Sequence, residues 1–202
     1  APSSARSRRT RSGGASCKEE ATMLLERIHH VAYRCRDAKE TVEFYRDILE
    51  MDFVLAISED RVPSTKEPDP YMHIFLDAGQ GNILAFFELP NSPPMDRDHN
   101  TPSWVQHIAF KVKDMATLLA IKANLERRGL DVVGPTNHEL FHSIYFFDPN
   151  GHRIELAADT ADPEMLRKLH EIAPKMLEDW TRTKRTVRDA AWVHSKELNA
   201  GV

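Results

Sequence analysis

The sequence predicts an α+β fold made of two copies of one βαβββ module and a helical tail. The first observation is a repeat. The strand pattern at 30–37 recurs at 104–114, with His30 aligned on His107 and Asp37 on Asp114, 77 residues apart. The second observation is that each copy continues with one helical pattern and three further strand patterns. Because a single module has a helix on only one face of its sheet, we expect the two modules to pair into one domain with a cupped mixed sheet.

The first module is expected at residues 24–90. Its first strand, 28–35, alternates with period two, so His30 lies on the face opposite Val31 and Tyr33. Asp37 and Glu40 form a capping-box pattern that begins the helix. The remaining elements are a strand at 51–57, a loop at 58–70 that is rich in proline and charge, and a hairpin formed by 71–76 and 82–89.

A proline-rich linker is expected at 91–102, and the second module at 103–158. Alternation along its first strand places Ile108, Phe110 and Val112 under the helix and His107 on the opposite face. Asp114 begins that helix and Gly129 ends it. The module closes with a strand at 130–133 and a hairpin, in which 143–147 and 153–156 flank the turn sequence Asp-Pro-Asn-Gly at 148–151.

The two ends of the chain differ from the modules. Residues 1–22 combine four arginines with Ser, Gly and Ala and have almost no large apolar side chain, so we expect a disordered leader or added extension before a domain at 23–158. The segment 159–202 is predicted to be helical, with one helix from Pro163 to about Ala173, a break at Pro174, and further helix to about Leu198. This tail is expected to pack across the domain or onto a second subunit, which leaves a homodimer open.

Composition excludes several classes of function. The chain has 202 residues, a net charge of −4 and a pI of about 6.2, so it lacks the basic field of a nucleic-acid-binding protein. No apolar run reaches the roughly 20 residues that cross a bilayer. Cys17 and Cys35 do not make a disulfide framework, which favours a reducing cytoplasm. We therefore expect a cytoplasmic protein that binds a small molecule, with neither nucleic acid nor membrane as a partner.

Four residues form a candidate metal constellation. His30 and His107 lie on the first strand of each module, and Glu88 and Glu155 on the last. Two imidazoles and one carboxylate with open positions suit Fe(II), whereas four protein ligands of these types suit Ni, Zn, Mn or Co. A carboxylate such as Glu155 needs a partner when it is buried, and that partner is either a metal or an arginine.

These residues carry a family resemblance. The turn and strand 148–155, Asp-Pro-Asn-Gly-His-Arg-Ile-Glu, resembles the vicinal oxygen chelate superfamily, which includes glyoxalase I, methylmalonyl-CoA epimerase, bleomycin and fosfomycin resistance proteins and type I extradiol dioxygenases. The resemblance covers roughly 24–158 and implies a glyoxalase-like domain. A longer run, Thr-Asn-His at 136–138, Ile-Tyr at 144–145, then Asp148, Pro149, Gly151 and Glu155, resembles the extradiol dioxygenase pattern throughout.

Carried over by position, the resemblance implies His30, His107 and Glu155 as iron ligands. It implies that His138 and Tyr145 face the substrate, where they steer protons and hydrogen-bond a catecholic oxygen. Glu88 stands where glyoxalase I supplies a fourth ligand and base, which the dioxygenases do not use. The sequence thus predicts an Fe(II) ring-cleavage dioxygenase, with a Ni-, Zn-, Co- or Mn-dependent lyase or isomerase, or a metal-free binding protein of the same fold, as alternatives.

Overall fold

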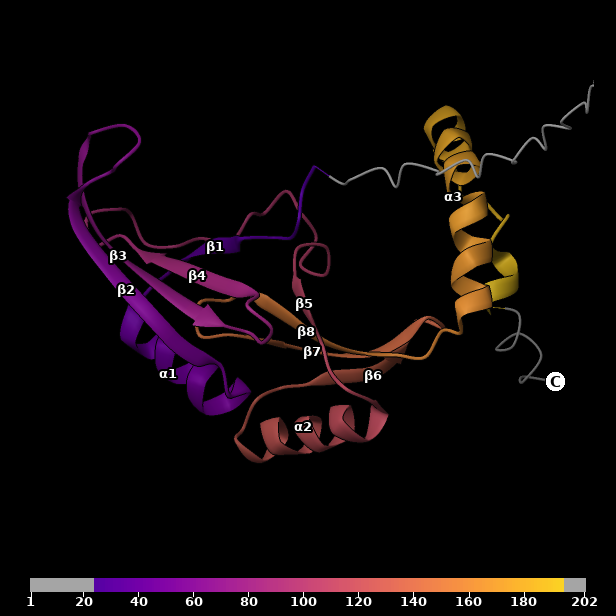
Figure 1. Ribbon diagram of the computed structural model, residues 1–202, viewed down its shortest axis with the longest axis horizontal. Coiled ribbons are helices and arrows are strands. Elements are labelled where there is room, and N and C mark those ends of the chain that lie inside the picture. The colour runs from indigo at the N-terminus through magenta and orange to yellow at the C-terminus, as the bar shows by residue number, and fades with distance from the viewer. Residues whose placement is uncertain (1–23, 195–202) are drawn as a thin grey trace, which may run out of the picture.

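The structure, a computed structural model, describes residues 24–194, so the expectations for residues 1–22 and for the end of the tail lie outside the described residues. The first module has the order strand, helix, three strands (Figure 1). Its elements are β1 (His30–Cys35), α1 (Ala38–Leu49), β2 (Asp52–Arg61), β3 (Pro68–Asp77) and β4 (Ile83–Glu88).

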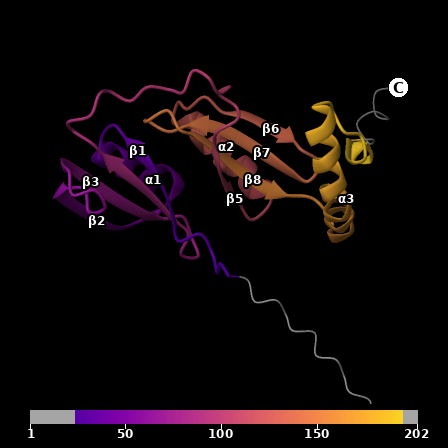
Figure 2. The same cartoon turned by 90° about the horizontal axis from the view of Figure 1, so that it is seen from above.

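The second module repeats this order after a long connector. Its elements are β5 (Ile108–Lys111), α2 (Met115–Arg127), β6 (Val133–Asn137), β7 (Phe141–Phe147) and β8 (Arg153–Asp159). The strand orders β1-β4-β3-β2 and β5-β8-β7-β6 match, and in both sheets the first strand pairs in parallel with the last. The predicted α+β fold of two βαβββ modules is therefore confirmed, with the modules lying end to end in the view from above (Figure 2).

Both helices lie on the same side of the molecule, each under its own sheet (Figure 1). Their N-caps are those that the sequence predicts, since the Asp37 carboxylate accepts from Glu40 N and the Asp114 carboxylate from Thr117 N, each at 2.8 Å. The core lies between the helices and the sheets, with Tyr45, Phe86 and Ile154 among its fully buried side chains. The opposite face of each sheet is free of helix, and the candidate site residues other than Glu88 lie there.

The turn between β7 and β8 ties the two modules together. The Tyr45 hydroxyl on α1 donates to the Asp148 carboxylate at 3.0 Å, and both groups are buried. The Asn150 side chain accepts from Arg36 N at 2.8 Å and donates to the Thr41 hydroxyl at 3.1 Å. Because these partners are more than 100 residues apart in the chain, the Asp-Pro-Asn-Gly turn is a joint between modules as well as a hairpin.

Two local predictions were wrong. The segment 58–70 is mostly strand, because β2 continues to Arg61 and β3 begins at Pro68. Pro70 is tolerated because β3 pairs with β4 only from Met72 onward, so no ladder bond is lost on that side. The strand expected at 130–133 begins at its last residue, Val133, and continues to Asn137.

The tail also differs from the prediction. One helix, α3 (Pro163–Thr183), runs without interruption through Pro174, and a short 3₁₀ turn, η1 (Ala191–His194), follows a non-helical segment. A proline removes one helical hydrogen bond. None of the α3 side chains is buried, so we attribute the tolerance of Pro174 to water that reaches the carbonyl left without a donor.

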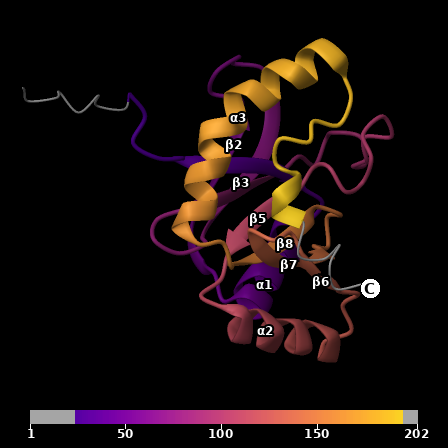
Figure 3. The same ribbon diagram turned by 90° about the vertical axis from the view of Figure 1, so that its right-hand side faces the viewer.

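Helix α3 stands beyond the second sheet and rises on the side opposite α2 (Figure 3). Leu166, Leu177 and Trp180 lie on its exposed surface. Within the described residues, neither α3 nor any other helix is long and apolar enough to cross a membrane.

Candidate metal centre

The centre of the site is a contact between His107 and Glu155. In the parallel register of β5 and β8, Ala109 pairs with Glu155, so the imidazole of His107, just before β5, reaches across to the carboxylate. Nε2 of His107 lies 2.9 Å from Oε2 of Glu155. Glu155 is only 3% exposed, so this carboxylate depends on its protein partners for its polar contacts.

The tautomer of His107 suits this pair to a cation. Its Nδ1 lies 2.9 Å from the backbone oxygen of Val105, which is only an acceptor, so Nδ1 carries the proton and Nε2 has a free lone pair. Two acceptors 2.9 Å apart need a proton or a metal cation between them. Two ligand atoms that each lie about 2.1 Å from one ion, with an angle of about 90° at the ion, are about 3 Å apart. The His107–Glu155 pair therefore fits two neighbouring positions around a divalent metal.

The second oxygen of Glu155 anchors a line of hydrogen bonds. Oε1 accepts from the buried Ser143 hydroxyl and from the Tyr145 hydroxyl, the latter at 3.1 Å. The Tyr145 oxygen in turn lies 2.8 Å from Nε2 of His138. A phenol has one proton, so when the Tyr145 hydroxyl donates to Glu155 its oxygen accepts from His138. These two hydrogen bonds give a proton a continuous path between His138 and Glu155.

The Tyr145 phenol is held in its protonated form. Burial raises its pKa above the ordinary value of 10, and the nearby Glu155 carboxylate raises it further. The Arg153 guanidinium lies 4.1 Å from the centre of the Tyr145 ring and opposes this effect in part. At neutral pH Tyr145 is therefore a hydrogen-bond donor in a site that also holds a carboxylate and an imidazole.

His30 is not part of this contact network. It lies at the start of β1 on the helix-free face of the first module, where its Nδ1 contacts Nδ1 of His29 at 2.8 Å. Its ring neighbours are His73 and Phe75, with centroids at 6.3 and 6.0 Å. Residues 24–194 contain no group of three or more His, Cys, Asp or Glu side chains that are arranged to hold a metal, so one copy of the chain brings together His107 and Glu155 alone.

Glu88 is not the counterpart of Glu155, which corrects the expected equivalence. Ala32, two residues after His30, pairs with Ala85, just as Ala109, two residues after His107, pairs with Glu155. Glu88 lies three residues further, on the face turned toward the helix. There its Oε2 accepts a hydrogen bond from the Ala38 backbone nitrogen at 2.6 Å, which satisfies an N-terminal donor of α1.

Two residues of the network were missed by sequence reasoning. Ser143 faces Glu155 because it lies two residues before Tyr145 on β7, and the period of two would have placed it there. Arg153 shares the face of Glu155, but its guanidinium contacts the Tyr145 ring and donates to the Trp104 backbone oxygen, at 2.6 Å, rather than to the carboxylate.

Gly134 supports the position of Ser143. The β6–β7 register shifts between Val133 and Thr136, and Gly134 lies within this irregularity at φ +107°. A Cβ at this position would lie 2.5 Å from the Ser143 carbonyl oxygen, closer than real Cβ atoms approach. The close approach of β6 to Ser143 therefore requires a glycine.

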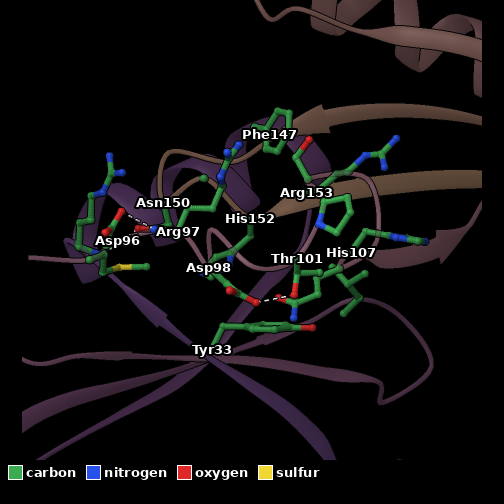
Figure 4. A pocket seen from close by; sticks show the side chains of 17 residues that line it. Tyr33, Asp96, Arg97, Asp98, Thr101, His107, Phe147, Asn150, His152 and Arg153 are labelled. Carbon is green, nitrogen blue, oxygen red and sulfur yellow. Dashed lines mark hydrogen bonds between the residues drawn. The ribbon is translucent and has the colours of Figure 1, made fainter.

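A cavity of about 640 Å³ opens beside His107 (Figure 4). The connector before β5, the start of β8 and Tyr33 of β1 contribute to its wall. Figure 4 shows His107 and Arg153 together at one side of this cavity and Arg97 on another.

Comparison with known proteins places this geometry in a family. The sequence model of the Glyoxalase/Bleomycin resistance protein/Dioxygenase superfamily matches residues 27–156, which span both modules. The chain belongs to this superfamily. The match ends one residue after Glu155, so the candidate site lies inside the superfamily region and α3 lies outside it.

Relatives of this superfamily member have names that indicate different chemistries. The chain is 28% identical over 86 residues to MhqA of Bacillus subtilis, which is named as a putative ring-cleaving dioxygenase; the match covers 43% of the chain and 27% of that protein. It is 30% identical over 119 residues to the metallothiol transferase FosB of Shouchella clausii, covering 53% of the chain and 80% of the relative. FosB of Staphylococcus epidermidis is 27% identical over 160 residues, which cover 76% and 97%.

Solved structures confirm the superfamily fold. A glyoxalase/dioxygenase from Nostoc punctiforme matches with a TM-score of 0.51 and 23% identity over 68% of the chain and 94% of that structure. The trypanothione-dependent glyoxalase I of Leishmania major matches with a TM-score of 0.50 and 20% identity over 78% and 99%.

Proposed function

We propose that this superfamily member is a metal-dependent enzyme, and specifically an Fe(II) extradiol-type dioxygenase that cleaves a catechol-like aromatic ring. The observation that carries the proposal is the line from His138 through Tyr145 and Glu155 to His107. It joins a candidate acid–base pair to a candidate metal pair through contacts of 2.8 to 3.1 Å. The similarity to MhqA supports the same reaction class.

His107 and Glu155 would hold the metal together with His30 from a second copy of the chain. One copy supplies two ligands, whereas the sequence motif calls for three. His30 is exposed on the helix-free face of the other module, so a symmetric dimer that lays this face over the second module of its partner completes two equivalent sites. In such a dimer each metal site would contain ligands from both copies, so metal binding would depend on the proposed homodimer.

The residues around the pair have distinct roles in this proposal. Fe(II) held there would supply the Lewis acidity and the dioxygen chemistry that cleavage of a catechol needs. Tyr145, which keeps its proton at neutral pH, would turn that one proton from Glu155 to a substrate oxygen and so orient the ring. His138 donates from Nε2 to the Tyr145 oxygen, so its other ring nitrogen would accept and return the proton of the catechol hydroxyl. Ser143 fixes the Glu155 carboxylate so that its other oxygen stays directed at the metal position.

An aromatic substrate is favoured by the surroundings of His30. On the same face of the first module, the His73 ring stacks on Phe87 with centroids 3.6 Å apart, and Phe75 lies 4.1 Å from His73. These rings form an apolar wall beside the proposed third ligand. Aromatic faces pack well against a planar ring of the size of a catechol.

A second candidate function is the transfer of a thiol to an electrophilic small molecule. It is favoured by the match to FosB of Staphylococcus epidermidis, which spans 97% of that protein. His107, Glu155 and Tyr145 would serve there as well, because a metal that polarises a substrate oxygen needs the same ligands. The two candidates differ in whether dioxygen or a thiol is consumed.

The test is reconstitution of the full chain with Fe(II) without oxygen, followed by a panel of catechols with an oxygen electrode and absorbance of the yellow ring-fission product. We expect one dioxygen consumed per catechol opened. Matched assays with Mn(II), a low-molecular-weight thiol and an epoxide measure thiol loss. Oxygen uptake without a metal-dependent thiol reaction supports the dioxygenase. Thiol consumption without oxygen uptake by any catechol overturns it in favour of the transferase.

A further inference from the structure

The cavity beside His107 has an excess of unpaired positive charge. Three guanidinium groups line it, those of Arg36, Arg97 and Arg153. Among residues 24–194 none of the three forms an ion pair with a carboxylate, although most charged side chains of α3 do. Guanidinium groups with free donors suit an anion, because they bind carboxylates and phosphate-like groups through parallel hydrogen bonds.

The two carboxylates in the same wall are already occupied by the connector. Asp96 accepts from the Arg97 backbone nitrogen at 2.7 Å and contacts the His99 ring at 3.3 Å. Asp98 accepts from the Thr101 hydroxyl and from the Asn100 backbone nitrogen, the latter at 2.9 Å. These bonds fold the connector on itself, and Figure 4 shows Asp98 directed at Thr101. The guanidinium groups therefore retain unused donors.

Arg153 is held where an anion on a metal-bound substrate would meet it. It lies two residues before Glu155 on the same face of β8, and one of its terminal nitrogens donates to the Trp104 backbone oxygen at 2.6 Å. The Tyr145 ring supports the guanidinium plane at 4.1 Å. Arginine has five N–H donors, so this fixed group keeps several for a ligand.

We propose that this cavity binds an anionic group of the substrate, a carboxylate or a phosphonate, with Arg153 as the residue that contacts it. Arg36 and Arg97 add positive potential from the other walls. The inference rests on the proposed function, because it takes the reacting oxygens to lie at the His107–Glu155 pair. It narrows the substrate class to acidic molecules, such as a catechol that bears a carboxylate.

The experiment compares 3,4-dihydroxybenzoate with 4-methylcatechol in the Fe(II)-loaded full chain. We expect kcat/KM to favour the acid by about ten- to hundredfold in the parent, through KM, as a charge-assisted contact would give. Arg153→Met should remove this preference, and Arg153→Lys should restore part of it. Arg127→Met on α2, which removes one charge away from the cavity, is the matched control and should leave the ratio unchanged.

A binding measurement separates this inference from the proposed reaction. Titration calorimetry with benzoate and with phenylphosphonate, without oxygen or turnover, should show binding to the parent and to Arg127→Met and at least tenfold weaker binding to Arg153→Met. The tighter of the two anions identifies the preferred acidic group. If both anions bind and no catechol is cleaved, the anion site stands and the dioxygenase proposal fails. If catechols are cleaved while neither anion binds, or Arg153→Met keeps the parental preference, the inference is overturned.

Discussion

The two modules share one backbone plan and differ in chemistry at matching positions. Where Ala109 of the second module pairs with Glu155 and Glu155 with Tyr145, Ala32 of the first pairs with Ala85 and Ala85 with Phe75. The second module thus has a polar network on its helix-free face and the first has an aromatic wall. Because the second module contributes a polar face and the first an apolar face, the repeated fold can enclose a ligand between two surfaces of different chemical character.

The largest effect is expected when Glu155 is replaced by alanine, the residue at the matching position of the first module. Glu155→Ala should weaken binding of a divalent metal by more than about 100-fold, because it removes a ligand outright. Metal content after dialysis, with circular dichroism as a check of folding, measures this. Glu155→Gln, which preserves the contact with Ser143, should lose metal as well.

Glu88→Gln is the control on the other glutamate. It should leave metal content unchanged and lower the free energy of unfolding by about 1 kcal/mol, since it weakens one N-terminal bond of α1. Loss of metal from Glu88→Gln would restore the four-ligand interpretation of the site.

The next largest effect is expected at Tyr145, whose counterpart in the first module is Phe75. Tyr145→Phe copies Phe75 of the first module and should lower kcat by about 100-fold, the usual contribution of an acid–base group. Metal content should remain as in the parent, because Tyr145 is not a proposed ligand. A variant that turns over at the parental rate would exclude Tyr145 from proton transfer.

A mixing experiment tests whether the two faces meet between copies. His30→Ala and His107→Ala should each be inactive alone. Random exchange of subunits between equal amounts should restore activity at about a quarter of the sites, since half of the dimers are mixed and each mixed dimer has one intact site. Activity that stays absent after verified exchange of subunits would place all three ligands within one copy.

A last effect concerns stability rather than activity and belongs to the first module alone. Burial raises the pKa of the Cys35 thiol from 9.0 to about 11, and the offset of the repeat places Val112 at the matching position. Because the folded pKa is the higher one, stability is fully present below pH 9 and falls as pH rises from 9 toward 11, by about 2 kcal/mol. Urea unfolding across this range measures the loss, and Cys35→Val should flatten the curve.

The fold was predictable because the repeat is visible in residues whose structural role depends mainly on their neighbours in the sequence. Asp37 and Asp114 both cap helices, and the apolar alternation around His30 and His107 is the pattern of a strand with one covered face. Pro174 and the charged segment 58–70 misled the prediction. Their effect depends on whether a neighbouring strand or helix needs the missing hydrogen bond, and this is decided by tertiary structure.

The site was predictable in its second half only. His107, His138, Tyr145 and Glu155 belong to one module, where turn spacing and the period of two fix their relations. Glu88 was matched to Glu155 by its place at the end of a strand, whereas the register, which no single sequence displays, matches Ala85. The position of His30 relative to the His107–Glu155 pair depends on how the modules assemble. The local sequence pattern does not determine that assembly.

Gly134 shows that the permissible sequence around this centre is narrower than its contacts alone suggest. The residue touches neither the carboxylate nor the imidazole, yet the smallest side chain there would push on the backbone that carries Ser143. A single methyl group on a neighbouring strand would thereby loosen the brace behind Glu155. Engineering of this protein should leave Gly134 untouched even though it takes no part in the chemistry.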